Sequence, residues 1–190
     1  MADPVPERAG RAHRRWWLIG TIAVVVIALD QLSKWWALDT LTTRTIDVVW
    51  TLRFALARNP GAAFSLGSGS GITRFLPLLV LGVVAVVIWQ GRAALTRSGA
   101  VALGMIVGGA LGNIVDRALR TDGGAFFSGK VVDFIDLQWW PVFNIADAAV
   151  VCGGILLVLS SIWAERGAAR ADAASGAADP SDAPAAGSGS

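Results

Sequence analysis

Four long apolar segments limit this chain to a small set of folds. They span residues 16–36, 72–90, 100–116 and 142–163, and a helix needs roughly 20 apolar residues to cross the hydrocarbon core of a bilayer. Apolar residues form 54% of the sequence and charged residues only 16%, a composition outside the range of ordinary soluble domains. We therefore predict a polytopic α-helical membrane protein with four transmembrane helices.

Tryptophan and arginine positions support this assignment and orient it. A cluster of arginines between residues 8 and 15 favours a cytoplasmic N-terminus, and four spans then return the C-terminus to the same side. The first segment lacks a signal-peptide cleavage site, so we expect it to be retained in the cell membrane. Indole rings prefer the headgroup layer, and the tryptophans at the proposed span ends are Trp16, Trp17, Trp35, Trp36, Trp89, Trp139, Trp140 and Trp163.

We divide the chain into a basic cytoplasmic tail (1–15), a four-helix membrane domain (16–163) and a C-terminal tail (164–190). The last part is rich in Ala, Ser, Gly, Asp and Pro, and we expect a disordered cytoplasmic extension. Between the first two spans, at about residues 40–66, apolar and polar side chains alternate over 51–56, as in a half-buried strand. This pattern predicts a small extracytoplasmic β-sheet on the membrane surface.

Turn signals flank that stretch near Thr42 and Thr43 and at Asn59-Pro60-Gly61. Elsewhere the sequence argues against several classes of site. A net charge of +2 with scattered basic residues does not favour nucleic-acid binding. The only histidine, His13, lies in the basic tail, and we expect the only cysteine, Cys152, to be a small buried residue. We therefore expect no metal and no cofactor.

Polar residues inside the spans are costly and call for an explanation. Asp30 and Lys34 lie four residues apart, a spacing that suits an ion pair across one helical turn. A helix-end pair and a role at a site fit this spacing equally well. The third segment carries a stripe of small residues, Gly104, Gly108 and Gly112, which favours close packing against another helix.

Five further polar residues follow or flank the spans. For Asn113, Asp116 and Arg117, packing and function are both open, and we expect Asp116 to be ionised and paired with the adjacent Arg117. Asp133 and Asp147 instead adjoin large apolar residues. Desolvation favours a neutral carboxyl, and two neighbouring carboxyls share one proton, which is the state that an aspartyl protease uses. Spacing alone still favours structural hydrogen bonding at a helix start over catalysis.

Five motifs, in this order, resemble bacterial lipoprotein signal peptidases, the signal peptidase II family. The resemblance covers about residues 16–163. It implies a membrane aspartyl endopeptidase that removes the signal peptide from diacylglyceryl-modified prolipoproteins, cutting just before the lipidated cysteine. The motifs are Asp30-Gln31-Leu32-Ser33-Lys34, Asn59-Pro60-Gly61-Ala62-Ala63-Phe64-Ser65, residues 108–117 (GGALGNIVDR), Val131-Val132-Asp133-Phe134 and Phe143-Asn144-Ile145-Ala146-Asp147.

By this resemblance the catalytic pair falls on Asp133 and Asp147. The resemblance also implies an active site that opens to the outer face of the cytoplasmic membrane. We expect a monomer whose partners are lipid-modified prolipoproteins and membrane lipids, with no nucleic acid. Positions that shape or support the site fall on Asp30, Lys34, Asn59, Gly61, Asn113, Asp116, Arg117, Asn144 and Ala146.

Two other function classes compete with a peptidase. A proton or cation relay predicts acids at several depths along the spans, whereas the acids here gather at one end of each span. A scaffold protein built on the glycine stripe predicts that carboxylate-to-amide changes have no effect, and it leaves the shared position of the acids unexplained.

Overall fold

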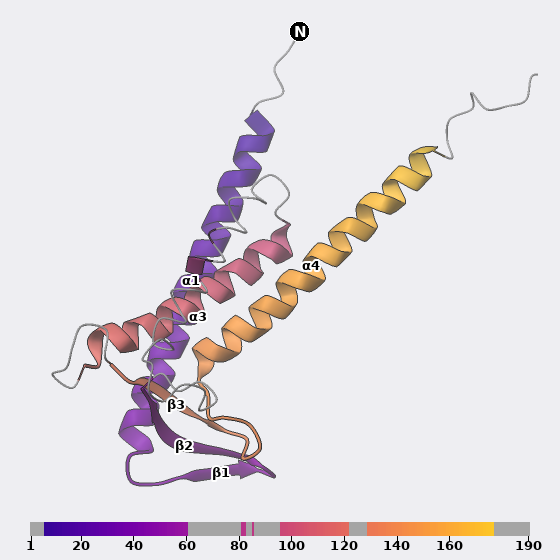
Figure 1. The fold of residues 1–190 in the computed structure, drawn as a ribbon. Coiled ribbons are helices and arrows are strands. Elements are labelled where there is room, and N and C mark those ends of the chain that lie inside the picture. The colour runs from indigo at the N-terminus through magenta and orange to yellow at the C-terminus, as the bar shows by residue number, and fades with distance from the viewer. Residues whose placement is uncertain (1–5, 61–80, 83–84, 86–95, 122–128, 177–190) are drawn as a thin grey trace, which may run out of the picture.

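The computed structural model describes residues 6–60, 81–82, 85, 96–121 and 129–176. Within these ranges, three helices are long and apolar enough to cross a membrane. They are α1 (Pro6–Thr40), α3 (Arg97–Leu119) and α4 (Ile145–Gly176), with α3 packed against both of the others (Figure 1). The predicted span at 72–90 lies almost entirely outside the described residues.

The three other predicted spans each fall on one of these helices, and the helices are longer than the spans. Residues 164–176, which the sequence analysis places in a disordered tail, continue α4 as helix. This stretch is rich in alanine with glutamate and arginine, all strong helix formers. Cys152 is exposed on α4, so the expectation that it is buried is wrong for the described part of the chain.

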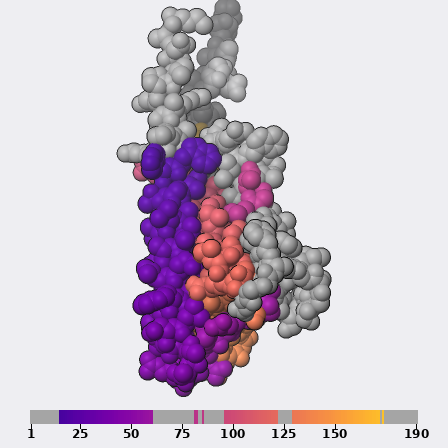
Figure 2. Space-filling model, turned by 90° about the vertical axis from the view of Figure 1, so that its left-hand side faces the viewer, coloured from indigo at the N-terminus to yellow at the C-terminus, as the bar shows by residue number. Residues whose placement is uncertain are grey.

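Glycines on α3 bring the three helices together. A Cβ atom built on Gly108 would lie 2.8 Å from the carbonyl oxygen of Ala23 in α1. Gly109, on another face of α3, leaves no room for a side chain against the carbonyl of Ala146 in α4. The resulting close approach of α1 and α3 is visible from the side in Figure 2. This geometry confirms packing as the role of the glycine stripe.

A methyl group added at Gly108 should therefore push α1 and α3 apart. We expect Gly108→Ala to lower the free energy of unfolding by about 1–3 kcal/mol, the usual cost of overpacking. Gly20→Ala on α1 is the matched control, because a Cβ there meets nothing within 4 Å. Thermal unfolding in detergent measures both variants, and equal midpoints for the two would contradict the packing role.

The described strands form one antiparallel sheet in the order β1-β2-β3. Strands β1 (Ile46–Val49) and β2 (Leu52–Asn59) come from the surface region predicted at about 40–66, whereas β3 (Val131–Asp136) comes from outside it. The β1–β2 turn at Trp50 and Thr51 was also missed, because it contains no glycine, asparagine or proline.

The sheet packs against the C-terminal end of α1, and β3 also contacts α3 (Figure 1). Ala37 of α1 and Leu41, the residue after α1, form a buried cluster with Val132 and Phe134 of β3. The ring of Trp36 meets Phe54 edge-on at a centroid distance of 5.5 Å and covers the same cluster. This apolar contact holds β3 beside the ends of the helices, where the polar residues of the spans also lie.

Candidate active site

A fully buried ion network lies where α1 meets α3. The Lys34 Nζ atom is 2.8 Å from Asp30 Oδ2 and 3.0 Å from Asp116 Oδ2, and all three side chains have an exposed fraction of 0%. Lys34 also donates to Asn113 Oδ1 at 3.0 Å. Buried charges are tolerated only when they are paired and hydrogen-bonded, so this network explains how four polar residues of the spans are accommodated.

Two residues that the sequence analysis did not select complete this network. Arg120 Nε lies 2.9 Å from Asp116 Oδ1, one helical turn further along α3. Gln31 Nε2 donates to Asp30 Oδ2 and to Asp116 Oδ1, both at 3.1 Å. We expected Arg117 to pair with Asp116; within the part of the chain that the structure describes, Asp116 forms ion pairs with Lys34 and with Arg120. Residues i and i+4 share a helix face, whereas adjacent residues do not, and this spacing was the signal for Arg120.

The buried network also fixes the two elements that carry the remaining acids. Asp30 Oδ1 accepts a hydrogen bond from the backbone nitrogen of Ala146 in the first turn of α4, at 3.0 Å. Asp116 Oδ2 accepts one from the backbone nitrogen of Val132 in β3, also at 3.0 Å. Gly112 gives Asp30 its space, since a Cβ there would lie 2.6 Å from Asp30 Oδ2. The network therefore sets β3 and α4 relative to each other.

Asn144 joins the two aspartates of the predicted pair. Its Nδ2 donates to Asp133 Oδ1 at 2.6 Å, and its backbone nitrogen donates to Asp147 Oδ2 at 3.3 Å. Its Oδ1 in turn accepts from the Asp147 backbone nitrogen at 2.9 Å, which completes a reciprocal capping box at the start of α4. Asn113 Nδ2 donates to Asp147 Oδ1 at 2.8 Å. Each carboxyl is thus held in place by an asparagine side chain.

Two acids of the same strand have opposite pKa shifts. Burial, and next the negative charge of Asp147, raise the pKa of Asp133 from 3.8 to about 7, against hydrogen bonds from Asn59 and Asn144. Desolvation also acts on Asp136, but the Arg53 side chain that donates to it at 2.7 Å holds the pKa of that carboxyl below its usual value. The Asp133 carboxyl therefore begins to lose its proton only near pH 7, where an ordinary aspartate is fully ionised, and this suits a general acid.

The remaining predicted site residues lie around this pair, with one exception. Asn59, at the end of β2, hydrogen-bonds to Asp133. The side chain of Arg117 is 5% exposed, and its carbonyl accepts from the backbone nitrogen of Gly129 at 3.1 Å, just before β3. Gly61 lies outside the described residues. The structure thus gathers the described members of the predicted site at one end of the helices.

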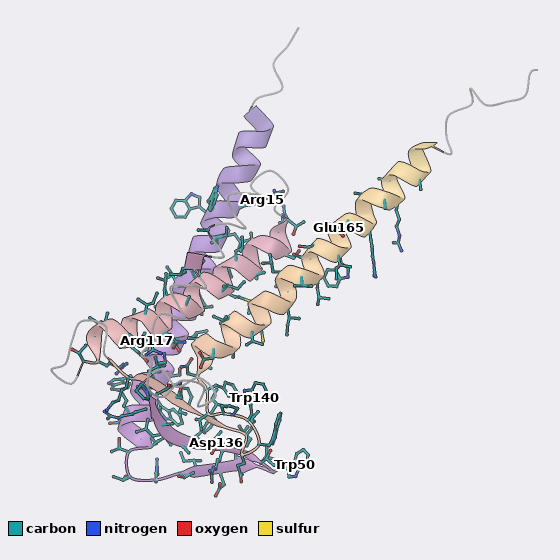
Figure 3. All side chains as sticks on the ribbon, in the orientation of Figure 1. Arg15, Trp50, Arg117, Asp136, Trp140 and Glu165 are labelled. Carbon is teal, nitrogen blue, oxygen red and sulfur yellow. The ribbon has the colours of Figure 1, made fainter. Side chains whose placement is uncertain are left out.

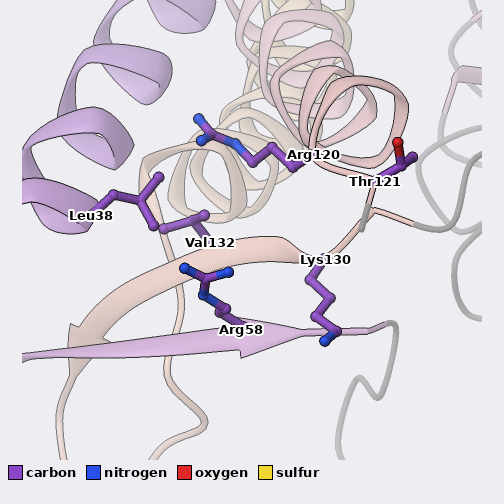
Figure 4. A pocket seen from close by; sticks show the side chains of 6 residues that line it. All are labelled: Leu38, Arg58, Arg120, Thr121, Lys130 and Val132. Atoms are coloured by element: carbon purple, nitrogen blue, oxygen red, sulfur yellow. The ribbon is translucent and has the colours of Figure 1, made fainter. Parts of the chain in front are cut away.

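A cavity of about 240 Å³ lies beside this site, at the edge of the sheet (Figure 4). Three cationic side chains line it together with Leu38, Thr121 and Val132: Arg58 from β2, Arg120 from the end of α3 and Lys130 from just before β3. Neither Asp133 nor Asp147 is among its lining residues. Among the described residues, the charged side chains that line this cavity are all cationic, and the acid pair does not line it.

The comparisons with known proteins agree with this geometry. The family model for signal peptidase (SPase) II matches residues 22–163. The chain belongs to the signal peptidase II family. A lipoprotein signal peptidase from Mycobacterium tuberculosis is 44% identical over 174 residues, which cover 85% of this chain and 84% of that protein. One from Mycolicibacterium smegmatis is 43% identical over 170 residues, or 85% of this chain and 71% of that protein.

The fold is also similar to that of a solved membrane enzyme. A bacterial membrane enzyme solved by the in meso method has a TM-score of 0.60 and 31% identity to this chain, covering 75% of this chain and 85% of that one. The signal peptidase II match begins within α1 and ends within α4, so it contains the sheet, the buried network and both aspartates.

Proposed function

We propose that this chain is an aspartyl endopeptidase that cleaves the signal peptide from diacylglyceryl-modified prolipoproteins just before the lipidated cysteine. Family membership supports the reaction class. The single observation that carries the mechanism is the Asp133–Asn144–Asp147 arrangement, in which one asparagine contacts both carboxyls. Paired carboxyls in one site activate a water molecule without a covalent intermediate.

The two aspartates take different roles in this proposal. The charge of Asp147 is one of the causes that keep the proton on Asp133. Asp147, whose two oxygens accept from Asn113 and from the Asn144 backbone, acts as the general base. It removes a proton from water, and the oxygen attacks the scissile carbonyl while Asp133 donates its proton to the carbonyl oxygen. The tetrahedral intermediate then expels the amine, which takes up the proton held by Asp147, while the carbonyl re-forms and a hydroxyl proton returns to Asp133.

The buried network of Asp30, Lys34 and Asp116 has a positioning role here. It contacts the backbone at Val132 and Ala146, each one residue before a catalytic aspartate. Asn59 and Asn113 hold the carboxyls directly. A proton relay through the membrane is the weaker alternative, because the acids are clustered at one end of the helices instead of being distributed along them.

The proposal includes the membrane arrangement. In this proposal residues 16–163 form a domain of four membrane-spanning helices, of which the second along the chain is at 72–90. Both tails are cytoplasmic. The sheet and the acid pair then lie at the outer face of the cytoplasmic membrane, where the diacylglyceryl chains hold the substrate in the outer leaflet. We propose that the protein works as a monomer surrounded by membrane lipids.

Purified protein in detergent tests this function with two forms of one precursor. We expect the diacylglyceryl-modified form to be cut, with mass spectrometry placing the new N-terminus at the lipidated cysteine. The same precursor without the lipid should remain intact. Equal cleavage of both forms, or a cut at another bond, would refute the proposed substrate while leaving an aspartyl mechanism open to its own test.

A further inference from the structure

Four large apolar side chains are exposed at the free end of the sheet. Val49 ends β1 and Trp50 begins the β1–β2 turn, with exposed fractions of 67% and 97%. Trp139 and Trp140 follow β3, with exposed fractions of 70% and 49%. We call these four residues the tryptophan edge. Burying so much aromatic surface is strongly favourable, and nothing in the proposed reaction uses it. Figure 3 shows Trp50 at the tip and Trp140 nearby.

The backbone at this edge is strained in two places. Trp50 has a φ of 52° and Gln138 a φ of 66°, and within the described residues only these two non-glycine positions have positive φ. Bulky side chains rarely adopt this conformation, which glycine and asparagine adopt readily. A tryptophan at the tip of a tight turn therefore costs conformational energy, and such strain is typical of functional positions.

Polar contacts hold the two strained turns side by side. Gln138 Nε2 donates to the carbonyl of Thr51 at 3.0 Å, and the Gln138 backbone nitrogen donates to Asp136 Oδ1 at 2.7 Å. Arg53 of β2 binds the other oxygen of Asp136 at 2.7 Å. The tip and the segment after β3 thus form one fixed surface, on which the Trp139 and Trp140 rings meet edge-on at 6.1 Å.

The position of this surface identifies its partner. The sheet lies across the end of the helices that are able to span a bilayer, and the β1–β2 tip projects sideways past the start of α4 (Figure 1). In a bilayer spanned by these helices, a surface beside the helix ends would lie at the level of the headgroup layer. Indole rings favour this layer because they combine apolar area with one N–H donor.

We propose that the tryptophan edge inserts into the lipid headgroup layer and anchors the free end of the sheet to the membrane. Its four side chains carry no charge, so insertion depends on apolar burial and indole hydrogen bonding. The anchor therefore works on zwitterionic lipid and persists at high salt, unlike a basic patch that binds anionic lipid. The anchor keeps the sheet at a fixed distance from the acid pair.

Spin labelling in phosphatidylcholine vesicles tests this anchor. Cys152, the only cysteine of the chain, is replaced by serine, and a nitroxide is attached at Thr51→Cys beside the tip. We expect this label to collide preferentially with oxygen, as at headgroup and upper acyl depth. With Trp50→Gly added, collisions with a water-soluble nickel chelate should rise to the level of a label at Thr43→Cys, an exposed position before β1.

The Trp50→Gly change is chosen because glycine accepts the positive φ of this turn. The variant should therefore unfold in detergent at a midpoint equal to or above that of the parent, so that a lost anchor is not mistaken for a lost fold. A parent label that is as accessible to nickel as Thr43→Cys would overturn the anchor. An unchanged depth of the Thr51→Cys label in the Trp50→Gly variant would overturn it as well. So would a label that becomes shielded from nickel only after a precursor or another protein is added.

Discussion

Asparagine at Asp133 or at Asp147 is expected to slow cleavage of a lipidated precursor by at least about 10³-fold, within the range that general acid–base catalysis contributes. Asp133→Asn removes the proton that is delivered to the carbonyl oxygen. Asp147→Asn removes the base that takes a proton from water. Because both amides keep the shape of the side chain and an oxygen acceptor for the asparagine donors, the variants should remain folded.

Asp47→Asn is the matched control for these variants. Asp47 lies on the same sheet, in β1, but its side chain is exposed and it belongs to no part of the network. Single-turnover rates in detergent, with equal unfolding midpoints as the check on folding, compare all three variants. Rapid cleavage by a folded Asp133→Asn or Asp147→Asn protein would rule out the two-aspartate mechanism.

Lys34→Met is expected to have the largest effect on stability. Lys34 neutralises two carboxylates that have no exposed surface, Asp30 and Asp116. Removing one partner of a buried ion pair costs about 3–5 kcal/mol, because it leaves an uncompensated buried charge. The loss should also loosen β3 and α4, since both are held through those same carboxylates.

Unfolding midpoints in detergent measure this effect, with the exposed Lys130→Met as the control for loss of a positive charge. Adding Asp30→Asn to Lys34→Met removes one of the two stranded charges, and we expect it to recover part of the lost stability. A double variant less stable than Lys34→Met alone would show that packing of the lysine stem, not charge balance, accounts for the loss.

Much of the fold follows from the sequence because it depends on local patterns. Apolar length predicted the helices at 16–36, 100–116 and 142–163, and alternation predicted strand structure before Asn59. Strand β3 could not be found in this way, because it is short and its strand character depends on pairing with β2, far away in the chain. The turn at Trp50 carries no local turn signal, so only the pairing of β1 with β2 reveals it.

For the site, the four-residue spacing predicts ion pairs between residues of the same helix. The family motifs predict the other site residues. The four-residue spacing predicted the Asp30–Lys34 contact, and the same spacing between Asp116 and Arg120 was overlooked in favour of Arg117. Contacts between elements, such as Asn144 with Asp133, depend on how β3 and α4 pack. No periodicity within either segment encodes that packing.

The central claim is that Asp133 and Asp147 form one unit in which Asp133 holds the proton. Carbon-13 NMR of labelled aspartate carboxyls, with the Asp133 signal assigned by its absence in Asp133→Asn, measures this directly as a function of pH. We expect Asp133 to titrate with a pKa of about 7, and this midpoint should fall in Asp147→Asn because the neighbouring negative charge is gone. A midpoint near the ordinary aspartate value of about 4, or one that does not move in Asp147→Asn, would contradict the account.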